Sequence, residues 1–329
     1  MLTRRALITG LEGQDGSYLA ELLVAQGYEV FGIIRQPRQY SNLDDVRDQV
    51  ALTEADLLDQ PSLVRALRHA HPSEVYNLAS ASFVPISWQE PVLTAQFAAV
   101  GVTFIVEAIR EVDPSIRFYQ ASSSEIFGEP REVPQSEETP LSPRTPYGVA
   151  KAYGQYITAS YRPAHGTHAS SGILDNHESP RRPSDFLPQK IARAVAGIKL
   201  GLREELVVGD LDASRDWGVA GDYVRSMSLM LQQDEPADYV IATGETHSVL
   251  KCVQHEFARI GREWRRYVRP DVGLRRGNAE LHDLVSDPRR ARKALGWRPA
   301  VAFPDLIAML VDAALRSLQS ASAEAKVRT

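Results

Sequence analysis

Short apolar runs alternate with stretches of helical periodicity through the first half of the chain. The apolar runs have the length of buried strands and lie at residues 5–9, 28–34, 74–79, 116–121 and 167–174. The stretches between them repeat apolar residues every three or four positions, at residues 17–26, 61–70 and 92–112. Because strands that alternate with helices build a parallel sheet covered on both faces, the sequence predicts an α/β fold with a doubly wound parallel sheet.

The pattern changes after residue 165. A polar, proline-broken loop covers residues 176–183, and helical spacing returns at residues 189–200, 219–233, 287–295 and 304–318. We predict that residues 1–174 form the first domain and that residues 208–240 pack back on it. Residues 175–207 and 241–318 then form a smaller, partly non-contiguous C-terminal lobe. The polar tail, residues 319–329, is expected to be frayed.

Composition and charge are those of an ordinary globular protein. The formal charge of the 329 residues is −5 and no long basic run occurs, which argues against nucleic acid as a partner. No apolar window approaches the length of a signal peptide or a membrane span, so we expect a cytoplasmic protein with no membrane partner. The one cysteine, Cys252, excludes an intrachain disulfide and is best interpreted as a small apolar filler.

A glycine-rich turn follows the first strand and opens the first helix. Its glycines permit a tight turn and a close approach of the backbone to a pyrophosphate, which the helix N-terminus then faces. A plain strand-to-helix turn, with Asp15 complementing the helix dipole, is the alternative. At the start of an alternating α/β chain, the turn predicts a Rossmann-type dinucleotide site formed by Gly10, Gly13, Gln14, Asp15 and Gly16.

The end of the second strand indicates which dinucleotide binds. An acidic residue there hydrogen-bonds the ribose diol of NAD, but this chain has Arg35. Arginine suits a 2′-phosphate, so we predict NADP as the cofactor; Arg35 as a plain surface residue is the alternative. Asp56 and Leu57 follow a third short apolar stretch and are placed to contact the adenine.

Tyr147 and Lys151 form the only Tyr-x-x-x-Lys pair in the chain, on a stretch that we expect to be helical. A spacing of four puts both side chains on one helix face. An ammonium beside a phenol favours the phenolate, so we expect Lys151 to lower the pKa of Tyr147. Such a phenolate can take a proton from a sugar hydroxyl near neutral pH, which predicts a general base.

A row of hydroxyls and a carboxylate follows the strand at residues 116–121. Ligands bind at the carboxyl ends of strands in open α/β sheets, so Ser122, Ser123, Ser124 and Glu125 are expected beside the cofactor. A serine there can orient a substrate hydroxyl and hydrogen-bond Tyr147, and a glutamate can remove a C–H proton next to a ketone. The alternative is that the serines cap a turn and Glu125 is solvated.

Longer stretches resemble one branch of the extended short-chain dehydrogenases/reductases, the GDP-mannose 4,6-dehydratase family. The resemblance runs from residue 5 to about residue 315. Two segments are specific to this branch: residues 176–180, which read Asn-His-Glu-Ser-Pro, and residues 215–218, which read Arg-Asp-Trp-Gly. The other matching segments are residues 6–10, 13–16, 75–79, 120–122, 124–125, 147–151, 222–224, 230–233, 242–245 and 295–297.

The resemblance implies a reaction that agrees with these residues. Tyr147, assisted by Lys151, takes the C4 hydroxyl proton while NADP accepts the C4 hydride. Glu125 then removes the C5 proton, water leaves from C6, and the hydride returns to C6. Ser123 stands where the family has threonine, a change that keeps the hydroxyl. The implied substrate is GDP-mannose or a close GDP-sugar, the product is its 4-keto-6-deoxy derivative, and the implied assembly is a homotetramer.

The resemblance also assigns binding roles residue by residue. It implies cofactor contacts at Leu78, Ala79, Tyr147, Lys151 and His177. It implies substrate contacts at Ser82, Glu125, Asn176, Lys190, Arg215 and Glu280. His177 and Glu178 are equally well interpreted as sources of loop-stabilising hydrogen bonds. We expect no metal site, because no third ligand lies near them in the sequence.

Departures from the family pattern are concentrated in the C-terminal lobe. The family usually has Phe at Asp175, Gly at Pro183, Thr-Arg at residues 188–189, and Arg-Pro ahead of a Glu where residues 277–280 read Gly-Asn-Ala-Glu. A buried Asp175 needs a partner, because desolvating a lone carboxylate is costly. Within the dehydratase reaction, the departures leave open a nucleotide sugar with a different base or a different sugar, such as a heptose. They also leave open three other functions: a 4-ketoreductase, an epimerase that oxidises C4 without eliminating water, and a non-catalytic NADP-binding subunit.

Overall fold

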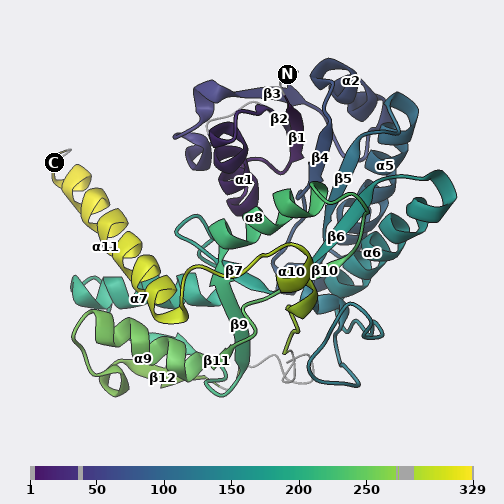
Figure 1. Cartoon of the computed structure of the whole chain (residues 1–329). Helices are drawn as coiled ribbons and strands as arrows, with labels where there is room; N and C mark the ends of the chain where they lie inside the picture. The colour runs from purple at the N-terminus through teal and green to yellow at the C-terminus, as the bar shows by residue number, and fades with distance from the viewer. Residues whose placement is uncertain (1–3, 36–39, 272, 274–284, 328–329) are drawn as a thin grey trace.

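Seven parallel strands form the centre of the fold (Figure 1). The computed structural model describes residues 4–35, 40–271, 273 and 285–327. The strands are β1 (Arg5–Thr9), β2 (Glu29–Ile34), β3 (Val50–Glu54), β4 (Glu74–Asn77), β5 (Arg117–Ala121), β6 (Ala169–Leu174) and β10 (Tyr239–Ile241). Their order is β10-β6-β5-β4-β1-β2-β3. Strands β2 and β3 are added on one side of β1, and β4 and the later strands on its other side, so the topological switch point lies between β1 and β4. The predicted doubly wound parallel sheet is confirmed.

Helices cover both faces of this sheet, and each presents an apolar face to it. The helices concerned are α1 (Gln14–Ala25), α2 (Gln60–Ala70), α5 (Gly101–Val112), α6 (Pro146–His165) and α8 (Ala220–Leu231). On one face, Leu19 and Leu23 of α1 share a buried core with Met227 of α8. On the other face, the core formed by α2 and α5 includes Leu67 and Ile105. Burial of these helix faces is the main force that holds the layers together.

The long apolar helix expected at residues 92–112 is a continuous run of three segments. These are α4 (Pro91–Ala95), a π-helical turn η3 (Gln96–Val100) and α5. A short helix, α3 (Val84–Gln89), precedes them. By length and mean hydropathy the run Pro91–Val112 could cross a membrane, so our expectation that no window approaches that length was wrong. Half of its apolar window is buried in this fold, where α5 packs between α2 and α6, as a core helix does.

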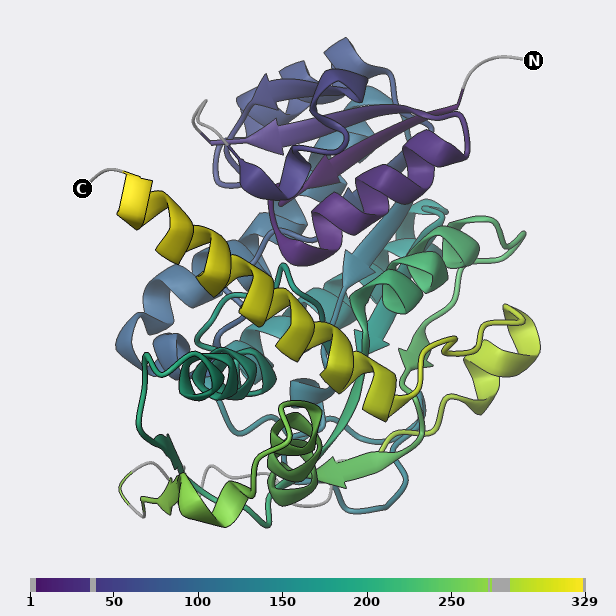
Figure 2. The ribbon, with the colours of Figure 1, turned by 90° about the vertical axis from the view of Figure 1, so that its left-hand side faces the viewer.

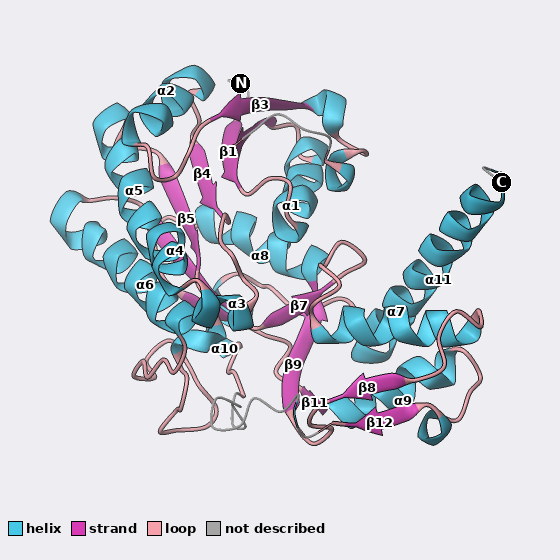
Figure 3. Cartoon of the chain, turned by 180° about the vertical axis from the view of Figure 1, so that it is seen from behind, coloured by secondary structure: helices cyan, strands magenta, loops and turns pink. Residues whose placement is uncertain are grey.

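The C-terminal half adds two small sheets and a second apolar core. One sheet has β7 (Asn176–Glu178), β9 (Ser214–Val219) and β11 (Thr246–Ser248), and the other pairs β8 (Leu206–Val208) with β12 (Val268–Pro270). The helices α7 (Leu187–Lys199), α9 (Val249–Arg259) and α11 (Phe303–Val327) gather beside β8 and β12 (Figure 3). Figure 2 shows α11 crossing this half, with α7 packed against it. Of the segment 208–240, which we expected to pack back on the first domain, α8 packs on α1 and β10 joins the large sheet, whereas β9 belongs to the C-terminal half.

The C-terminal helix is longer than the sequence pattern indicated. We expected residues 319–329 to be frayed, but α11 continues to Val327. The extra turns are rich in alanine and contain no glycine or proline, so nothing in their sequence ends the helix. The remaining short elements are α10 (Arg289–Ala294) and the 3₁₀ turns η1 (Ser41–Leu43), η2 (Arg47–Gln49), η4 (Ser124–Ile126) and η5 (Trp264–Arg266).

One carboxyl group is buried inside the second apolar core and forms no ion pair with the residues that the structure describes. Glu256 of α9 is 0% exposed, and its Oε1 accepts a weak hydrogen bond from the Cys252 thiol at 3.4 Å. Its Oε2 has no hydrogen-bond partner among the described residues. Burial raises the pKa of Glu256 well above its ordinary value, so the folded protein keeps this group protonated.

Replacing Glu256 with methionine is therefore expected to stabilise the protein by about 1–3 kcal/mol near neutral pH. The unfolded chain releases the Glu256 proton once the pH exceeds its ordinary pKa, and the folded chain does not, so the parent loses stability as pH rises. The gain in Tm of Glu256→Met over the parent should grow with pH above the ordinary glutamate pKa and be smallest, and independent of pH, below it. A difference in Tm that does not change with pH would contradict this account.

Candidate active site

The glycine turn between β1 and α1 brings two chain segments into close backbone contact. Gly10 has a φ of 68°, and a Cβ there would lie 2.9 Å from the Cα of Ala79. A Cβ on Gly16 would lie 2.2 Å from the Gly10 carbonyl oxygen, so both positions require glycine. Gly13 precedes α1 and no side chain caps that helix. Its first N–H groups therefore remain available to an anion, which fits the diphosphate of a dinucleotide.

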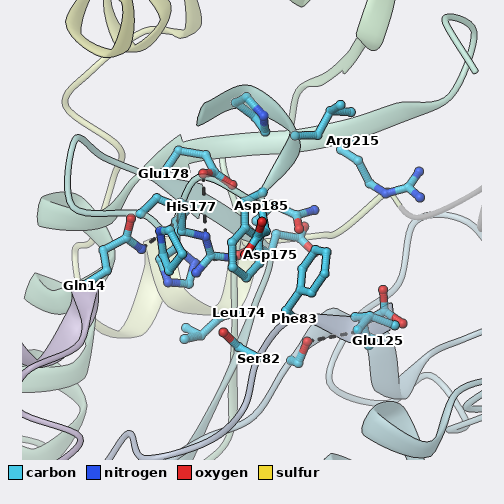
Figure 4. Close-up of a pocket in the computed structure, with 18 of the residues that line it drawn as sticks. Gln14, Ser82, Phe83, Glu125, Leu174, Asp175, His177, Glu178, Asp185 and Arg215 are labelled. Atoms are coloured by element: carbon cyan, nitrogen blue, oxygen red, sulfur yellow. Dashed lines mark hydrogen bonds and ion pairs between the residues drawn. The ribbon is translucent and has the colours of Figure 1, made fainter. Parts of the chain in front are cut away.

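A cavity of about 610 Å³ opens in front of this turn, at the carboxyl ends of the central strands. It brings together predicted site residues from distant parts of the chain: Gly10, Gly13, Gln14, Asp15, Gly16, Leu78, Ser82, Ser123, Glu125, Tyr147, Lys151, Asn176, His177, Lys190 and Arg215. Figure 4 shows Gln14, His177 and Glu178 on one side of this pocket and Glu125 on the other. The arrangement is that of a ligand site at the switch point of an open α/β sheet.

A second cavity of about 330 Å³ adjoins the first, and Gly10, Gly13 and Leu78 line both. Arg35, Leu57 and Ala79 line it, and the Arg35 guanidinium lies 5.3 Å from the centroid of the Phe97 ring. Asp56, which we expected at the adenine, lines neither cavity, and its carboxylate accepts a hydrogen bond from the Leu58 N–H at 2.8 Å. Glu280 lies outside the described residues.

Tyr147 and Lys151 lie on one face of α6, as their spacing predicted. The helix begins at Pro146, and Thr145 caps it by accepting a hydrogen bond from the Gly148 N–H at 2.9 Å. Tyr147 is 6% and Lys151 4% exposed, and both line the larger cavity. The Lys151 ammonium donates to the Ala121 carbonyl at 2.8 Å and lies 5.6 Å from the centroid of the Tyr147 ring.

The electrostatic effect on Tyr147 differs from the one that we expected. Burial raises the pKa of Tyr147 above its ordinary value, and the nearby Glu125 raises it further, whereas the Ser123 hydrogen bond lowers it. Burial also lowers the pKa of Lys151 to about 8. The net lowering of the Tyr147 pKa that we expected is wrong for this structure, because burial of the phenol outweighs the effect of nearby cations and the Lys151 ammonium is directed at a backbone carbonyl.

Ser123 and Glu125 lie at the turn that follows β5. The Ser123 hydroxyl accepts a hydrogen bond from the Glu125 N–H at 3.3 Å and also bonds the Tyr147 side chain. Thr145, the residue that caps α6, donates its hydroxyl to Glu125 at 3.5 Å. The β5 turn and the start of α6 are thus joined by side-chain hydrogen bonds that place one carboxylate and one phenol at the same wall of the cavity.

His177 connects β7 to the start of α1. Its Nδ1 lies 2.7 Å from the Asp175 carbonyl and its Nε2 lies 2.8 Å from the Asp15 carboxylate, so both ring nitrogens face acceptors. Burial opposes charge on both groups, but their mutual attraction outweighs it. The pKa of His177 is raised, and that of Asp15 is held at about 2. This is the geometry of a charged imidazolium paired with a carboxylate, so His177 has a structural role whatever it also contacts.

Gln14 reinforces the same connection. Its amide donates to the His177 carbonyl at 3.1 Å, and its carbonyl oxygen accepts from the Ser179 hydroxyl at 2.8 Å. The segment that begins at Asn176 is therefore fixed to the first turn of α1. Asn176 on β7, Arg215 on β9 and Lys190 on α7 line the cavity from the side of the small sheets.

Arg182 is a cavity residue that the sequence analysis did not single out. Its guanidinium stacks over the Phe186 ring, 3.6 Å from the centroid, and its Nε lies 3.6 Å from the Glu178 carboxylate. Its charge lowers the pKa of both Asp15 and Tyr147. The adjacent Arg181 instead pairs with Glu21 and stacks on Tyr18. The repeated arginine was visible in the sequence, but only the fold shows which of the two faces the cavity.

Comparisons with known proteins agree with this geometry. The family model described as GDP-mannose 4,6 dehydratase matches residues 7–310. GDP-mannose 4,6 dehydratase 2 of Arabidopsis thaliana is 45% identical over 321 residues, which cover 93% of this chain and 86% of that protein. The UDP-glucose 4-epimerase of Thermus thermophilus, solved with NAD, superposes with a TM-score of 0.82 at 26% identity and covers 94% of this chain and 98% of its own. RMD of Pseudomonas aeruginosa, complexed with NADPH, also superposes with a TM-score of 0.82, at 24% identity, and the match covers 96% of this chain and 99% of that chain.

Proposed function

The chain belongs to the GDP-mannose 4,6-dehydratase family and is a GDP-sugar 4,6-dehydratase, and we propose which of its residues perform each step of the reaction. The observation that supports the proposal is the joint placement of Glu125, Ser123 and Tyr147 at one wall of the cavity, next to the glycine turn. A reductase or an epimerase on this scaffold needs the phenol but has no use for a carboxylate beside it. Glu125 therefore favours elimination of water over the other reactions.

In the proposed reaction, the Tyr147 phenolate takes the proton from the C4 hydroxyl of the sugar, and the Ser123 hydroxyl orients that oxygen. A nicotinamide cofactor held beside the glycine turn would supply the acceptor for the C4 hydride and the donor of that hydride to C6. Glu125 takes the C5 proton, which the new ketone has made acidic, and passes a proton to the C6 hydroxyl as it leaves as water. Lys151 supports the negative charge on the phenolate. As the hydride is added at C6, C5 receives the proton that Tyr147 took from the C4 hydroxyl, which restores the phenolate. One water is lost and the cofactor is regenerated in each turnover.

The fold and the glycine turn support a nicotinamide cofactor, and we propose that it is NADP. The α1 N-terminus and Gly10 fit the diphosphate, and Leu78 and Ala79 line the adjoining cavity with Arg35. Arg35 stacks on Phe97 at the mouth of that cavity, where a guanidinium can pair with a 2′-phosphate. We assign Leu57 to the adenine. We retain His177 as a cofactor contact through its place in the cavity, in addition to its pairing with Asp15.

Replacing Arg35 with alanine tests the choice of cofactor. Loss of a charge-assisted contact to the 2′-phosphate should weaken NADP binding by about 10–100-fold and leave NAD binding nearly unchanged. Titration of the purified protein with each dinucleotide measures the two affinities. Arg65→Ala, which removes an exposed arginine of α2, is the matched control. An equal loss of affinity for NADP and NAD would contradict a role of Arg35 in recognising the 2′-phosphate.

We propose that the nucleotide sugar occupies the part of the cavity next to the small sheets. Asn176, Lys190 and Arg215 line it there, and Ser82 lines the cavity from the loop between β4 and α3. Their amide, hydroxyl and cationic groups suit a diphosphate and its sugars. GDP-mannose is the proposed substrate. We further propose that residues 1–174, with residues 208–240 packed on them, bind the cofactor, that residues 175–207 and 241–318 bind the nucleotide sugar, and that the protein acts in the cytoplasm.

We also propose that the chain forms a homo-oligomer. Large apolar side chains are exposed on neighbouring helices α3, α4 and α6, including Trp88, Val92, Val149, Tyr153 and Tyr156. Val149, Tyr153 and Tyr156 recur at helical spacing along the outer side of α6. A contiguous apolar surface of this kind supports contact with a second copy of the chain.

A further inference from the structure

Two buried carboxyl groups face each other below the sugar side of the cavity. β7 pairs with β9 in parallel register, with Asn176 opposite Trp217. Asp175 immediately precedes β7, so continuing this register by one residue brings it beside Asp216 of β9, whose charge acts on it. Asp175 is 4% and Asp216 2% exposed. Asp175 lines the cavity, and Figure 4 shows it among the residues that surround it. Like charges placed opposite each other across paired strands are destabilising, and more so when they are desolvated.

The two carboxyl groups differ in their hydrogen-bond partners. Asp216 accepts from the Thr243 N–H at 3.1 Å, the Thr243 hydroxyl at 2.8 Å and the Gly244 N–H at 2.7 Å. Asp175 has the hydroxyls of Ser124 and Ser286 nearby, but its Oδ2 is buried with no partner among the described residues. A carboxylate oxygen can only accept, whereas a protonated one can donate. Burial raises the pKa of both carboxyl groups. The three donors to Asp216, two of them backbone N–H groups, favour its charged form more than the two hydroxyls favour that of Asp175, so Asp175 is the group that takes the shared proton.

Two other ionisable groups among the described residues act on the pair, and both leave this assignment in place. His177, on β7, is a cation that acts on Asp175, but its ring is already paired with Asp15. Tyr223, on α8, approaches both carboxyls, and its buried hydroxyl has no partner in the described part of the chain. Burial, followed by the charge of Asp216, raises the pKa of Asp175. Two carboxyls this close titrate as one unit that keeps a proton where a lone aspartate has lost it.

Each member of the pair is adjacent in sequence to a proposed substrate contact. Asn176 follows Asp175 on β7, and Arg215 precedes Asp216 on β9. We propose that Asp175 is a positioning residue: it shares one proton with Asp216, and the neutralised pair keeps β7 and β9 together so that Asn176 and Arg215 both reach the nucleotide sugar. This inference rests on the proposed function for the identity of that ligand. Loss of the shared proton places two negative charges in the ladder and moves the two contacts apart.

Binding of GDP-mannose as a function of pH tests the inference without turnover. Calorimetric titration of NADP-loaded Tyr147→Phe protein should give a dissociation constant that is about 5–30-fold higher at about pH 8.5 than at about pH 6, since one linked proton allows at most tenfold per pH unit. Asp175→Asn, added to the same protein, keeps a neutral side chain of the same shape and should bind equally well at both pH values. Glu256→Met, which removes a buried carboxyl elsewhere, should keep the pH dependence of the parent.

A second measurement covers the case in which Asp175→Asn does not fold. Titrations of the Tyr147→Phe protein at about pH 8 in two buffers of different ionisation enthalpy should show uptake of up to one proton per GDP-mannose bound. No proton uptake, or the same pH dependence with and without Asp175, would overturn the inference and leave the proposed function standing. Failure to bind GDP-mannose at any pH would overturn the proposed function and this inference with it.

Discussion

Tyr147→Phe is expected to lower kcat for GDP-mannose by about 10²–10⁴-fold, the usual contribution of a general base, while the dissociation constants for NADP and GDP-mannose change by less than about threefold. Phenylalanine keeps the ring in its buried place on α6 and removes only the hydroxyl that bonds Ser123. Because burial raises the pKa of Tyr147, the parent should turn over faster as pH rises toward the ionisation of the phenol. The variant should lack that rise.

Tyr161→Phe is the matched control for this experiment. It removes a hydroxyl from the same helix, α6, where Tyr161 bonds Glu107 and lies outside the cavity. Steady-state kinetics with NADP in excess would measure both variants. A Tyr147→Phe protein that keeps more than about a tenth of the parent kcat would contradict the role of this phenol as the base.

Glu125→Gln is expected to block the elimination of water and not the first oxidation. Glutamine has the size of glutamate but cannot accept the C5 proton, so kcat should fall by about 10²–10⁴-fold. Reduced nicotinamide should build up on the enzyme, because the sugar is oxidised at C4 but no acceptor for the returning hydride is formed. Its near-ultraviolet absorbance band reports this state directly in a single turnover.

Hydrogen exchange at C5 separates this role from a loss of binding. In deuterated water the parent should place deuterium at C5 of the sugar, and Glu125→Gln should not. Glu129→Gln, an exposed residue of the same loop that pairs with Arg144, is the control and should behave like the parent. Rapid C5 exchange by Glu125→Gln would show that another group takes this proton.

The sequence predicted the parts of this molecule that depend on local pattern. The strand expected at residues 5–9 is β1, and the glycines at residues 10 and 16 lie where only glycine fits. Tyr147 and Lys151 share a helix face because Thr145 and Pro146 start α6 just before them, a signal that is readable in the chain itself. Local spacing and capping were sufficient for these features.

The features that depend on long-range packing could not be predicted in this way. The direction of the Lys151 ammonium is set by the Ala121 carbonyl on β5, and the role of Arg182 by its stacking on Phe186. Asp175 was recognised as a residue that needs a partner if buried, but the partner follows from the register of β7 against β9. Desolvation, which reverses the expected shift of the Tyr147 pKa, is likewise a property of the folded cavity.

The most direct test of the central claim is mass spectrometry of GDP-mannose that carries deuterium at C4, incubated with the purified protein and a catalytic amount of NADP. The account predicts a product that has lost one water, keeps the deuterium and carries it on C6, with no net formation of reduced cofactor. An unchanged sugar mass in the presence of folded, NADP-loaded protein would contradict the account. So would consumption of reduced cofactor in proportion to product, which would identify a reductase.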